Sequence, residues 1–210
     1  IPDYLFENCS GLETIDIPSA VKTIGISAFR SCTNLTEIEI PSSVTNIGCD
    51  AFYYCSNLEK LTLNEGLKTI GANSFQGTKI SSVNIPSTLT SVNMPSYDDH
   101  GPFYKSTTLK KVTIADNAAI IPDYLFENCS GLETIDIPYA VRTIGISAFE
   151  GCTSLKDITI HNPYCNIYNK NNTISNSATI KGYTPSTAKN YAKSYEREFV
   201  SLGSFTLGDV

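Results

Sequence analysis

The stretch FRSCTNLTEIEIPSSVTNIGCDA, residues 29–51, decides the fold because its pattern returns along most of the chain. The pattern is F-x-x-C-x-x-L-x-x-I-x-I-P-x-x-V-x-x-I-G-x-x-A, and a phenylalanine opens it every 23 residues except across one interruption. A fixed period of roughly 20–50 residues is the signature of a solenoid, in which each unit stacks on the next. Seven units begin at Phe6, Phe29, Phe52, Phe75, Phe103, Phe126 and Phe149.

The interruption lies between Phe75 and Phe103, which are 28 residues apart and enclose an insertion, MPSYDDHGP, at residues 94–102. The insertion also explains the spacing of a repeated 18-residue stretch. The stretch IPDYLFENCSGLETIDIP occupies residues 1–18 and recurs, letter for letter, at residues 121–138. Five units of 23 and a net insertion of five residues account for this spacing of 120. A recent duplication of a repeat block is the simplest origin.

Each unit predicts a strand followed by a corner. The alternation at Ile15 and Ile17, together with Leu12, is typical of a half-buried strand, and the proline that follows ends it. We expect short second strands and short helical turns on the outer side of a curved parallel sheet, which gives a right-handed, β-rich α/β solenoid. The glycine of each corner is expected in a backbone conformation that strains other residues. These glycines are Gly25, Gly48, Gly71 and Gly145.

The chain divides into a solenoid at residues 1–168, a cap at 169–202 and a linker at 203–210. The cap is predicted to contain a helix over about residues 186–196, because Ser186 suits an N-cap and apolar residues follow at helical spacing. Those residues are Ala188, Tyr191, Ala192 and Tyr195.

A single unit is too small to fold alone, so its stability must come from stacking on its neighbours. The first turn has no neighbour on its outer side. We therefore expect residues 1–6 to fray or to borrow a neighbouring molecule.

Composition narrows the function classes. The 210 residues are 41% hydrophobic and 17% charged, which is a globular composition. A net charge of -6 without a basic cluster argues against a nucleic-acid partner. No apolar run approaches the roughly 18–20 residues that a membrane span needs, so we expect none.

The 23-residue motif resembles the BspA-like leucine-rich repeats of bacterial cell-surface proteins, over residues 1–168. The segment ATIKGYTPSTAKNYAKSYEREFV, residues 178–200, looks like the cap that follows such arrays in secreted proteins. The resemblance implies a leucine-rich-repeat solenoid that is secreted or displayed on a bacterial surface. It also implies a non-catalytic interaction or adhesion module for a protein or glycan ligand.

The end of the chain carries a further resemblance. LGDV, residues 207–210, is similar to the start of a dockerin module, which would make a cohesin a partner and the parent a cellulosome component. The alternative function is a passive structural spacer, or a targeting module for an enzyme domain outside this fragment.

Five of the seven cysteines share one position of the unit, where Thr78 and Ser106 stand in the two irregular units. A position that accepts Cys, Thr or Ser favours buried free thiols, because stacked units would hold neighbouring Cβ vectors parallel and unsuited to a disulfide. The column cysteines are Cys9, Cys32, Cys55, Cys129 and Cys152. Cys49 and Cys165 lie off the column and are the candidates for reactivity.

No enzyme, metal or cofactor motif emerges from the sequence. The two histidines, His100 and His161, sit in unrelated places, and there is no C-x-x-C pair, P-loop or nucleophile elbow. Asp98, Asp99 and His100 gather in the insertion, where the simplest interpretation is a solvated loop that could touch a partner.

Two surfaces are therefore candidate binding sites. The alternative interpretations are solvated strand residues for the first and a packing role for several tyrosines of the second. The first is the outward row of the strand face: Asp16, Glu37, Glu39, Lys60, Thr62, Asn84, Lys111, Thr113, Asp136 and Asp157. The second is the insertion with a tyrosine patch: Tyr53, Tyr54, Tyr97, Asp98, Asp99, His100 and Tyr104, with Tyr139 beside them.

Overall fold

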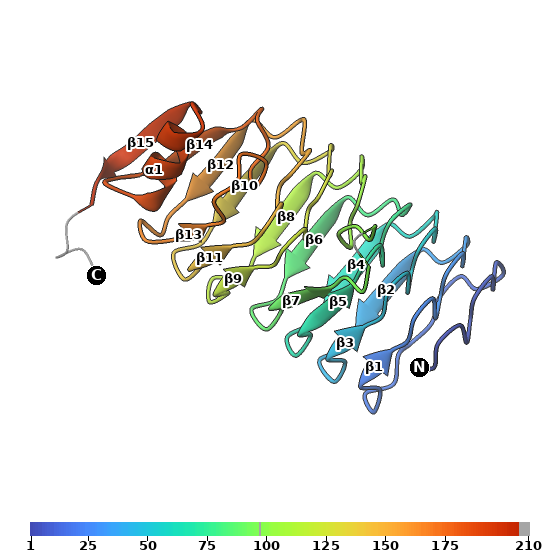
Figure 1. Cartoon of the computed structure of the whole chain (residues 1–210). Helices are drawn as coiled ribbons and strands as arrows, with labels where there is room; N and C mark the ends of the chain where they lie inside the picture. The colour runs from blue at the N-terminus through green and yellow to red at the C-terminus, as the bar shows by residue number, and fades with distance from the viewer. Residues whose placement is uncertain (97, 206–210) are drawn as a thin grey trace.

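The structure is a computed structural model that describes residues 1–96 and 98–205. The chain winds into a stack of similar turns, with the N-terminus at one end and the helix α1 at the other (Figure 1). Neighbouring turns pair through parallel strands on two faces. This is the repeat solenoid that the sequence predicts.

The first of these faces, called the main face, carries the longer strands. They are β2 (Glu37–Ile40), β4 (Lys60–Leu63), β6 (Ser82–Ile85), β8 (Lys111–Ile114), β10 (Thr134–Ile137), β12 (Asp157–Ile160), β14 (Thr179–Thr184) and β15 (Phe199–Ser204). The second, the short-strand face, carries β1 (Thr23–Ile24), β3 (Asn46–Ile47), β5 (Thr69–Gly71), β7 (Ser91–Asn93), β9 (Ile120–Ile121), β11 (Thr143–Ile144) and β13 (Asn166–Ile167).

The period of the sequence is also the register of the main face. Glu37 lies opposite Lys60, and Thr134 lies opposite Asp157, so partners are one 23-residue unit apart. Side chains in β2 alternate between exposed and buried, as the alternating pattern predicts. The hydrogen-bonded ladder breaks between β8 and β10, and also between β4 and β6. There the unit that starts at Phe75 reaches its strand one residue early.

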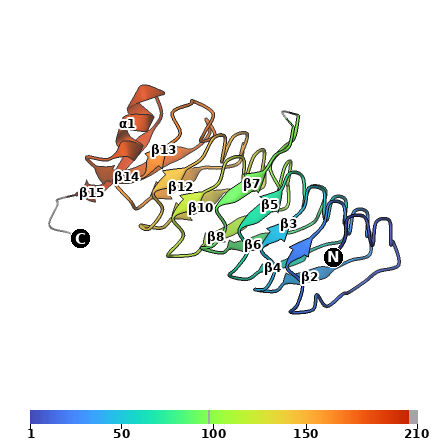
Figure 2. The same ribbon diagram turned by 60° about the horizontal axis from the view of Figure 1, so that its bottom comes forward.

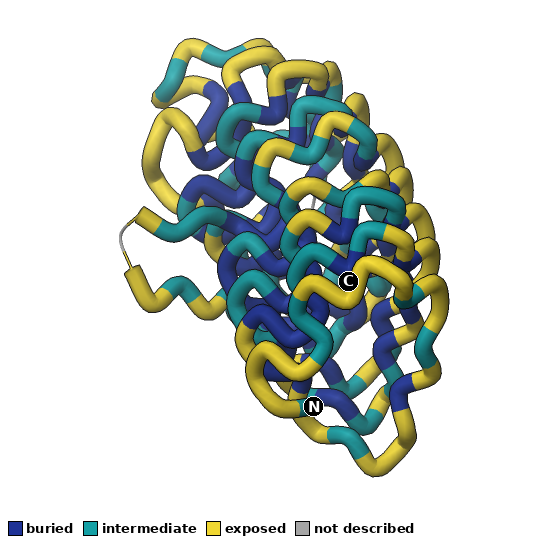
Figure 3. The backbone as a smooth tube through the Cα atoms, turned by 90° about the vertical axis from the view of Figure 1, so that its right-hand side faces the viewer, coloured by how far each residue is buried: buried dark blue, intermediate teal, exposed yellow. Residues whose placement is uncertain are grey.

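The unit phenylalanines form one continuous stack through the core. Phe29 and Phe52 are fully buried, and their ring centroids are 5.0 Å apart with planes within 5° of parallel. The remaining steps, from Phe6 to Phe149, measure 5.1, 5.3, 5.3, 6.0 and 5.6 Å. Buried backbone runs along the interior of the stack and exposed backbone marks its corners (Figure 3).

The turns around each phenylalanine are not regular helix. Ser27 and Ser31, two residues before and after Phe29, have φ of 52° and 58°. Their amides and that of Phe29 donate to carbonyls of the next turn at 2.7–2.9 Å, which continues the ladder around the corner. Left-handed residues interrupt any helix, so the expected short helical turns are single hydrogen-bonded turns. Among the described residues α1 is the only α-helix.

The corner glycines are needed for a different reason from the one that the sequence suggested. Gly25, Gly48, Gly71 and Gly145 do not have the positive φ that we expected. Instead, a Cβ added at Gly48 would lie 2.6 Å from the carbonyl carbon of Gly25 and from the amide nitrogen of Ile26. Successive turns approach backbone to backbone here, so the column excludes any side chain.

The first turn is held against the second. The Ile1 amino group donates to the Thr23 carbonyl at 2.7 Å, Gly25 donates back to Ile1 at 2.9 Å, and the Phe6 ring stacks on Phe29. The expected fraying of residues 1–6 is therefore not what the structure shows. Within residues 1–96, the open edge is instead the segment 12–17, which forms no regular strand.

The ladder continues beyond residue 168, where the sequence placed the boundary. β14 pairs in parallel with β12, and Ile174 takes the place of a phenylalanine beside Phe149. α1 (Thr187–Ser194) then connects β14 to β15, with Ser186 as its N-cap. The Ser186 hydroxyl accepts from the Lys189 amide at 3.0 Å, as predicted. β15 continues to Ser204, two residues into the segment assigned as a linker.

The insertion at residues 94–102 divides the short-strand face. β1, β3, β5 and β7 form one sheet, and β9, β11 and β13 form another. β6 and β8 still pair on the main face in full register. The segment between β7 and β8 rises above its neighbouring turns (Figure 2). The added residues thus interrupt the short-strand face, while the pairing on the main face is preserved.

Replacing Phe52 by alanine should lower the free energy of unfolding by about 3–5 kcal/mol, because the ring is fully buried between two stacked neighbours. Urea denaturation followed by circular dichroism measures the loss. Phe6→Ala is the matched control, since Phe6 is only half-buried and has one stacking neighbour, and it should cost less. A loss below about 1 kcal/mol for Phe52→Ala would mean that the stack does not stabilise the fold.

Gly48→Ala should destabilise the fold by about 1–3 kcal/mol, because the new methyl group meets backbone atoms that cannot rotate away. Gly11→Ala is the control, since nothing lies within 4 Å of its added Cβ, and it should change the stability by less than about 0.5 kcal/mol. Equal melting temperatures for the two variants would contradict the close approach of the turns.

Candidate functional site

The predicted strand-face residues all point outward from the main face. Nine are exposed and Asp157 is intermediate, while their neighbours in each strand are mostly buried. The sheet register brings Glu37 beside Lys60, and Glu39 beside Thr62. The exposed residues are Asp16, Glu37, Glu39, Lys60, Thr62, Asn84, Lys111, Thr113 and Asp136. The row predicted from alternation therefore lies outward on the main face, on strands of three hydrogen-bonded sheets except at Asp16.

Charges on the main face are partly paired between strands. Lys60 Nζ lies 3.3 Å from Glu37 Oε2, and Lys181 Nζ lies 3.0 Å from Asp157 Oδ1. The Asn64 amide donates to Glu39 Oε1 at 2.9 Å. Because these pairs are exposed or partly exposed, they contribute little to stability. They fix the position of the carboxylates on the face.

A hollow of about 380 Å³ lies at the amino-terminal end of the main face. Asp16, Glu37 and Glu39 bring three carboxylates to it, while Lys60 brings one ammonium group. A second hollow, of about 440 Å³, lies over β8, β10 and β12 and is lined by Lys110, Lys111 and Lys181 as well as by two aspartates. The acidic end and the mixed end of the same face thus differ in charge.

The insertion is docked on the solenoid. The sequence predicts a solvated loop instead, and the structure does not agree. The His100 ring stacks on Tyr104 with centroids 3.6 Å apart, and its Nδ1 lies 3.2 Å from Glu127 Oε1. Glu127 is buried and also accepts from the Gly101 amide at 3.1 Å. Asp99 accepts from the Ser96 amide at 2.7 Å, which closes the loop on itself.

The tyrosines do not form one patch. Tyr53 and Tyr54 pack edge to face with centroids 4.6 Å apart, and the Arg30 guanidinium lies over Tyr53 at 4.7 Å. Tyr104 instead packs on His100, and Tyr139 lines a cavity with the residues that follow β8 and β12. Asp98 is exposed, and Tyr97 lies outside the described residues.

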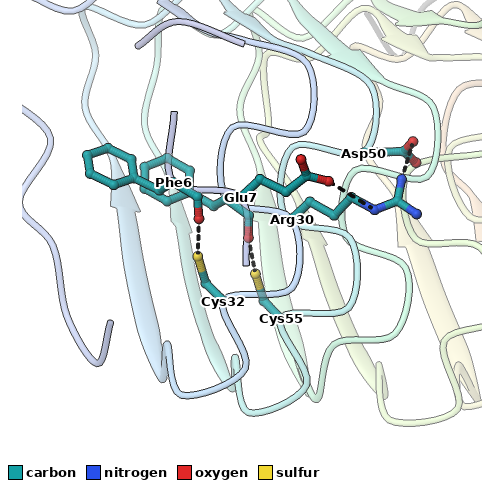
Figure 4. Close-up of polar contacts among 7 residues, drawn as sticks. Phe6, Glu7, Arg30, Cys32, Asp50 and Cys55 are labelled. Carbon is teal, nitrogen blue, oxygen red and sulfur yellow. Dashed lines mark hydrogen bonds and ion pairs between the residues drawn. The ribbon is translucent and has the colours of Figure 1, made fainter. Parts of the chain in front are cut away.

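Buried thiols line the interior beside the phenylalanine stack. Cys32 Sγ donates to the Phe6 carbonyl at 3.1 Å, and Cys55 Sγ donates to the Phe29 carbonyl at 3.0 Å (Figure 4). The same bond to the preceding turn occurs from Cys129 to Phe103 and from Cys152 to Phe126. All seven cysteines are free, as predicted for the five of the column, and four of those five are buried as predicted, whereas Cys9 is exposed.

The off-column cysteines are not the reactive thiols that we expected. Cys165 is fully buried, and burial raises its pKa to about 12. Burial also raises the pKa of Cys49, which is half-buried. Because the thiolate is the reactive form, both side chains are poor nucleophiles near neutral pH.

Among the described residues, no three His, Cys, Asp or Glu side chains come together in a way that could hold a metal ion. The same part of the chain contains no helix with the length and apolar content of a membrane-spanning segment.

Sequence reasoning missed a cavity of about 600 Å³ at the carboxyl ends of the last main-face strands. Its lining includes Asp116, His161, Tyr183 and Phe205, none of which we had predicted as binding residues. One signal was present. The duplicated stretches 1–29 and 121–149 differ at only two positions, and one of them places Tyr139 in this cavity.

Comparison with known protein families supports the repeat assignment. A family model described as "BspA type leucine rich repeat region (6 copies)" matches residues 1–101 and 96–195. No curated protein matches the chain.

Several solved structures are similar to this chain at low sequence identity. A T. pallidum leucine-rich repeat protein has a TM-score of 0.50 and 20% identity, over 92% of this chain and 84% of its own. A leucine-rich cell surface protein of Faecalibacterium prausnitzii has a TM-score of 0.46 and 21% identity, over 98% of this chain. Our chain spans 57% of that protein's length. A Bacteroides ovatus leucine-rich repeat protein has 23% identity and a TM-score of 0.36, over 95% and 80% of the two chains.

A thiol reagent such as DTNB should label Cys9 rapidly in the native protein, because Cys9 is the exposed thiol. Labelling at about pH 9 should not add the buried thiols, since burial keeps the pKa of Cys152 and Cys165 near 12. All seven thiols should react once the chain is unfolded. Cys9→Ser should remove the fast phase. Rapid labelling of Cys165 in the folded protein would contradict its burial.

Proposed function

Because the chain belongs to the BspA-type leucine-rich repeat family, we propose that it is a non-catalytic module that binds a protein partner through its main face. The observation that carries the proposal is the outward row of polar side chains on parallel strands. Strand backbones hold these side chains at fixed spacing, so little conformational entropy is lost when a partner binds. Repeat solenoids recognise partners through extended surfaces of this kind.

The amino-terminal hollow is the part of the main face that suits a partner best. Asp16, Glu37 and Glu39 give it an acidic character that the single Lys60 does not neutralise. The net charge of -6 has the same sign. Complementary charge accelerates encounter and sets orientation, so a partner with a basic surface is favoured here.

We also propose that the module works on a bacterial surface or outside the cell. The F. prausnitzii protein of similar fold is described as a cell surface protein, which supports this location. The proposed cohesin partner would require a dockerin, and the residues that suggest one, 207–210, lie outside the described residues. A role as a targeting module would be the same binding function in a larger protein that also carries an enzyme domain.

A passive spacer is the second candidate. It is favoured by the cross-strand pairs that already satisfy Glu37 and Asp157 on the main face. A spacer would keep its function after any change of these exposed side chains, provided that the stack stays folded. A binding module would lose its function after such a change. The experiment below therefore replaces exposed side chains of the main face.

Glu37→Lys combined with Glu39→Lys should abolish partner binding and leave the melting temperature nearly unchanged. Both side chains are exposed, and their pairs with Lys60 and Asn64 contribute little to stability. Binding is measured with the immobilised protein against host extracellular proteins and, separately, soluble plant polysaccharides, with and without the double change.

The control is Glu196→Lys combined with Glu198→Lys, which changes the net charge by the same amount on exposed residues of the cap. It should retain binding. Loss of binding in both double variants would indicate an effect of overall charge. Unchanged binding by the Glu37 and Glu39 double variant would contradict the main-face proposal. Absence of any bound protein or polysaccharide would favour the spacer.

A further inference from the structure

The cavity of about 600 Å³ at the carboxyl ends of the main-face strands, called the end pocket, lies apart from the amino-terminal hollow. Its lining combines two carboxylates, a histidine and three aromatic rings. These six residues are Asp116, Asp136, Tyr139, His161, Tyr183 and Phe205. A concave site with aromatic walls and a few convergent polar groups is the usual form of a binding pocket.

The common direction of the main-face strands explains why these residues meet. β8, β10, β12, β14 and β15 all run in the same direction, so the residues that follow or end them share one edge of the main face. Asp116 follows β8, Tyr139 follows β10, and His161 follows β12. Tyr183 is the penultimate residue of β14, and Phe205 follows β15, which α1 brings alongside.

The same edge is different in the first turns. Two residues beyond the last buried strand residue, where Asp116 and Tyr139 stand later, the earlier turns carry small or acidic side chains. These residues are Ser19, Ser42, Glu65 and Ser87. Among these equivalent positions, an aromatic side chain therefore occurs only at Tyr139.

The duplication isolates this change. Residues 1–29 and 121–149 are identical except that Ser19 corresponds to Tyr139 and Lys22 corresponds to Arg142. The second difference keeps the charge, whereas the first replaces a small hydroxyl by a ring that is 46% exposed and lines the end pocket. Tyr139 is thus not required by the fold, since the first copy makes the same turn with serine.

The aromatic wall is built by contact between the last strand and its neighbours. The Phe205 ring lies 5.8 Å from Tyr164, edge on, and 5.8 Å from Tyr183, tilted. Phe205 thereby joins the pocket wall to the loop after β12. Tyr139 faces the same cavity.

Asp116 and Asp136 give the lining of the end pocket a net negative charge, and Asp136 also lines the neighbouring hollow that Lys110, Lys111 and Lys181 border. Asp136 Oδ1 lies 2.7 Å from His161 Nε2, an exposed contact. Within the described residues, the salt bridges of 4.0 Å or less include no lysine or arginine beside Asp116 or Asp136. A neutral ligand that covered these carboxylates would leave them without the solvation that they now have, which is costly.

We propose that the end pocket binds an arginine side chain of the protein partner. A guanidinium stacks on tyrosine faces and bonds to carboxylates through its planar fork, so one group satisfies both kinds of lining residue. The inference rests on the proposed protein-binding function and names the chemistry of a second contact point. It uses residues separate from Glu37 and Glu39, so the two proposals can fail independently.

The test uses the peptide acetyl-Gly-Arg-Gly-amide, titrated into ¹⁵N-labelled protein and followed by amide NMR shifts. Shifts should concentrate at Tyr139, His161 and Tyr183. Replacing arginine by citrulline, which has the same shape without the charge, should weaken the apparent affinity about fivefold or more. Tyr139→Ser and Asp116→Asn should each weaken it by a similar factor.

The duplication supplies matched controls. Tyr139→Ser restores the residue that the first copy already carries, so the variant should fold, and its melting temperature verifies this. Asp16→Asn changes the first-copy counterpart of Asp136, and Ser19→Tyr places the ring on the other turn. Neither control should alter the titration.

Equal affinity for the citrulline peptide, unchanged affinity in Tyr139→Ser, or shifts outside the pocket would each overturn the arginine proposal. So would an absence of shifts at millimolar peptide. Shifts at the pocket with a soluble cello-oligosaccharide and none with the arginine peptide would reassign it to a glycan. In that case the main-face proposal is still judged by the Glu37 and Glu39 variant alone.

Discussion

The stacking of one phenylalanine ring on the next, one ring per turn, is the constraint on which the rest of the structure depends. Ring centroids are 5.0–6.0 Å apart, close to the ~4.8 Å between paired strands. The aromatic stack and the parallel ladders can therefore rise together. The stack continues from Phe75 to Phe103 at 5.3 Å across the insertion, so the added residues must leave on the side of the short-strand face.

Close approach of the turns explains the other fixed letters of the motif. Cys32 and its equivalents use a small thiol to reach a carbonyl of the preceding turn, and Gly48 uses the absence of a side chain to let the backbones touch. Left-handed residues on either side of the phenylalanine aim amides at the next turn. Each of these fixed positions of the motif, Phe, Cys and Gly, thus makes its own kind of contact with a neighbouring turn.

The candidate binding surfaces lie at positions of the repeat that make none of these contacts between turns. Outward side chains on the main face can change without touching the core, and the residues that follow each strand can change without altering its register. The duplicated block shows this freedom directly, since Ser19 and Tyr139 occupy equivalent positions in copies that otherwise differ only at Lys22 and Arg142. The amino-terminal hollow and the end pocket both lie in such positions.

By itself the sequence determined the period, the phenylalanine core, the outward and inward rows of each strand, the buried thiols and the Ser186 cap. Ser186 is a local N-cap signal, and the other features follow from a repeat in which each residue contacts its own equivalent one unit away. Only the tertiary structure decided the close approach at Gly48, the docking of His100 on buried Glu127, and the extension of the ladder beyond residue 168.

The end pocket also depended on the tertiary structure. Its aromatic wall comes partly from β14 and β15, where the spacing is no longer periodic and a helix crossover sets which side chains meet. A repeat pattern predicts contacts between equivalent residues. It does not predict contacts that depend on how an aperiodic segment folds back over the last turn.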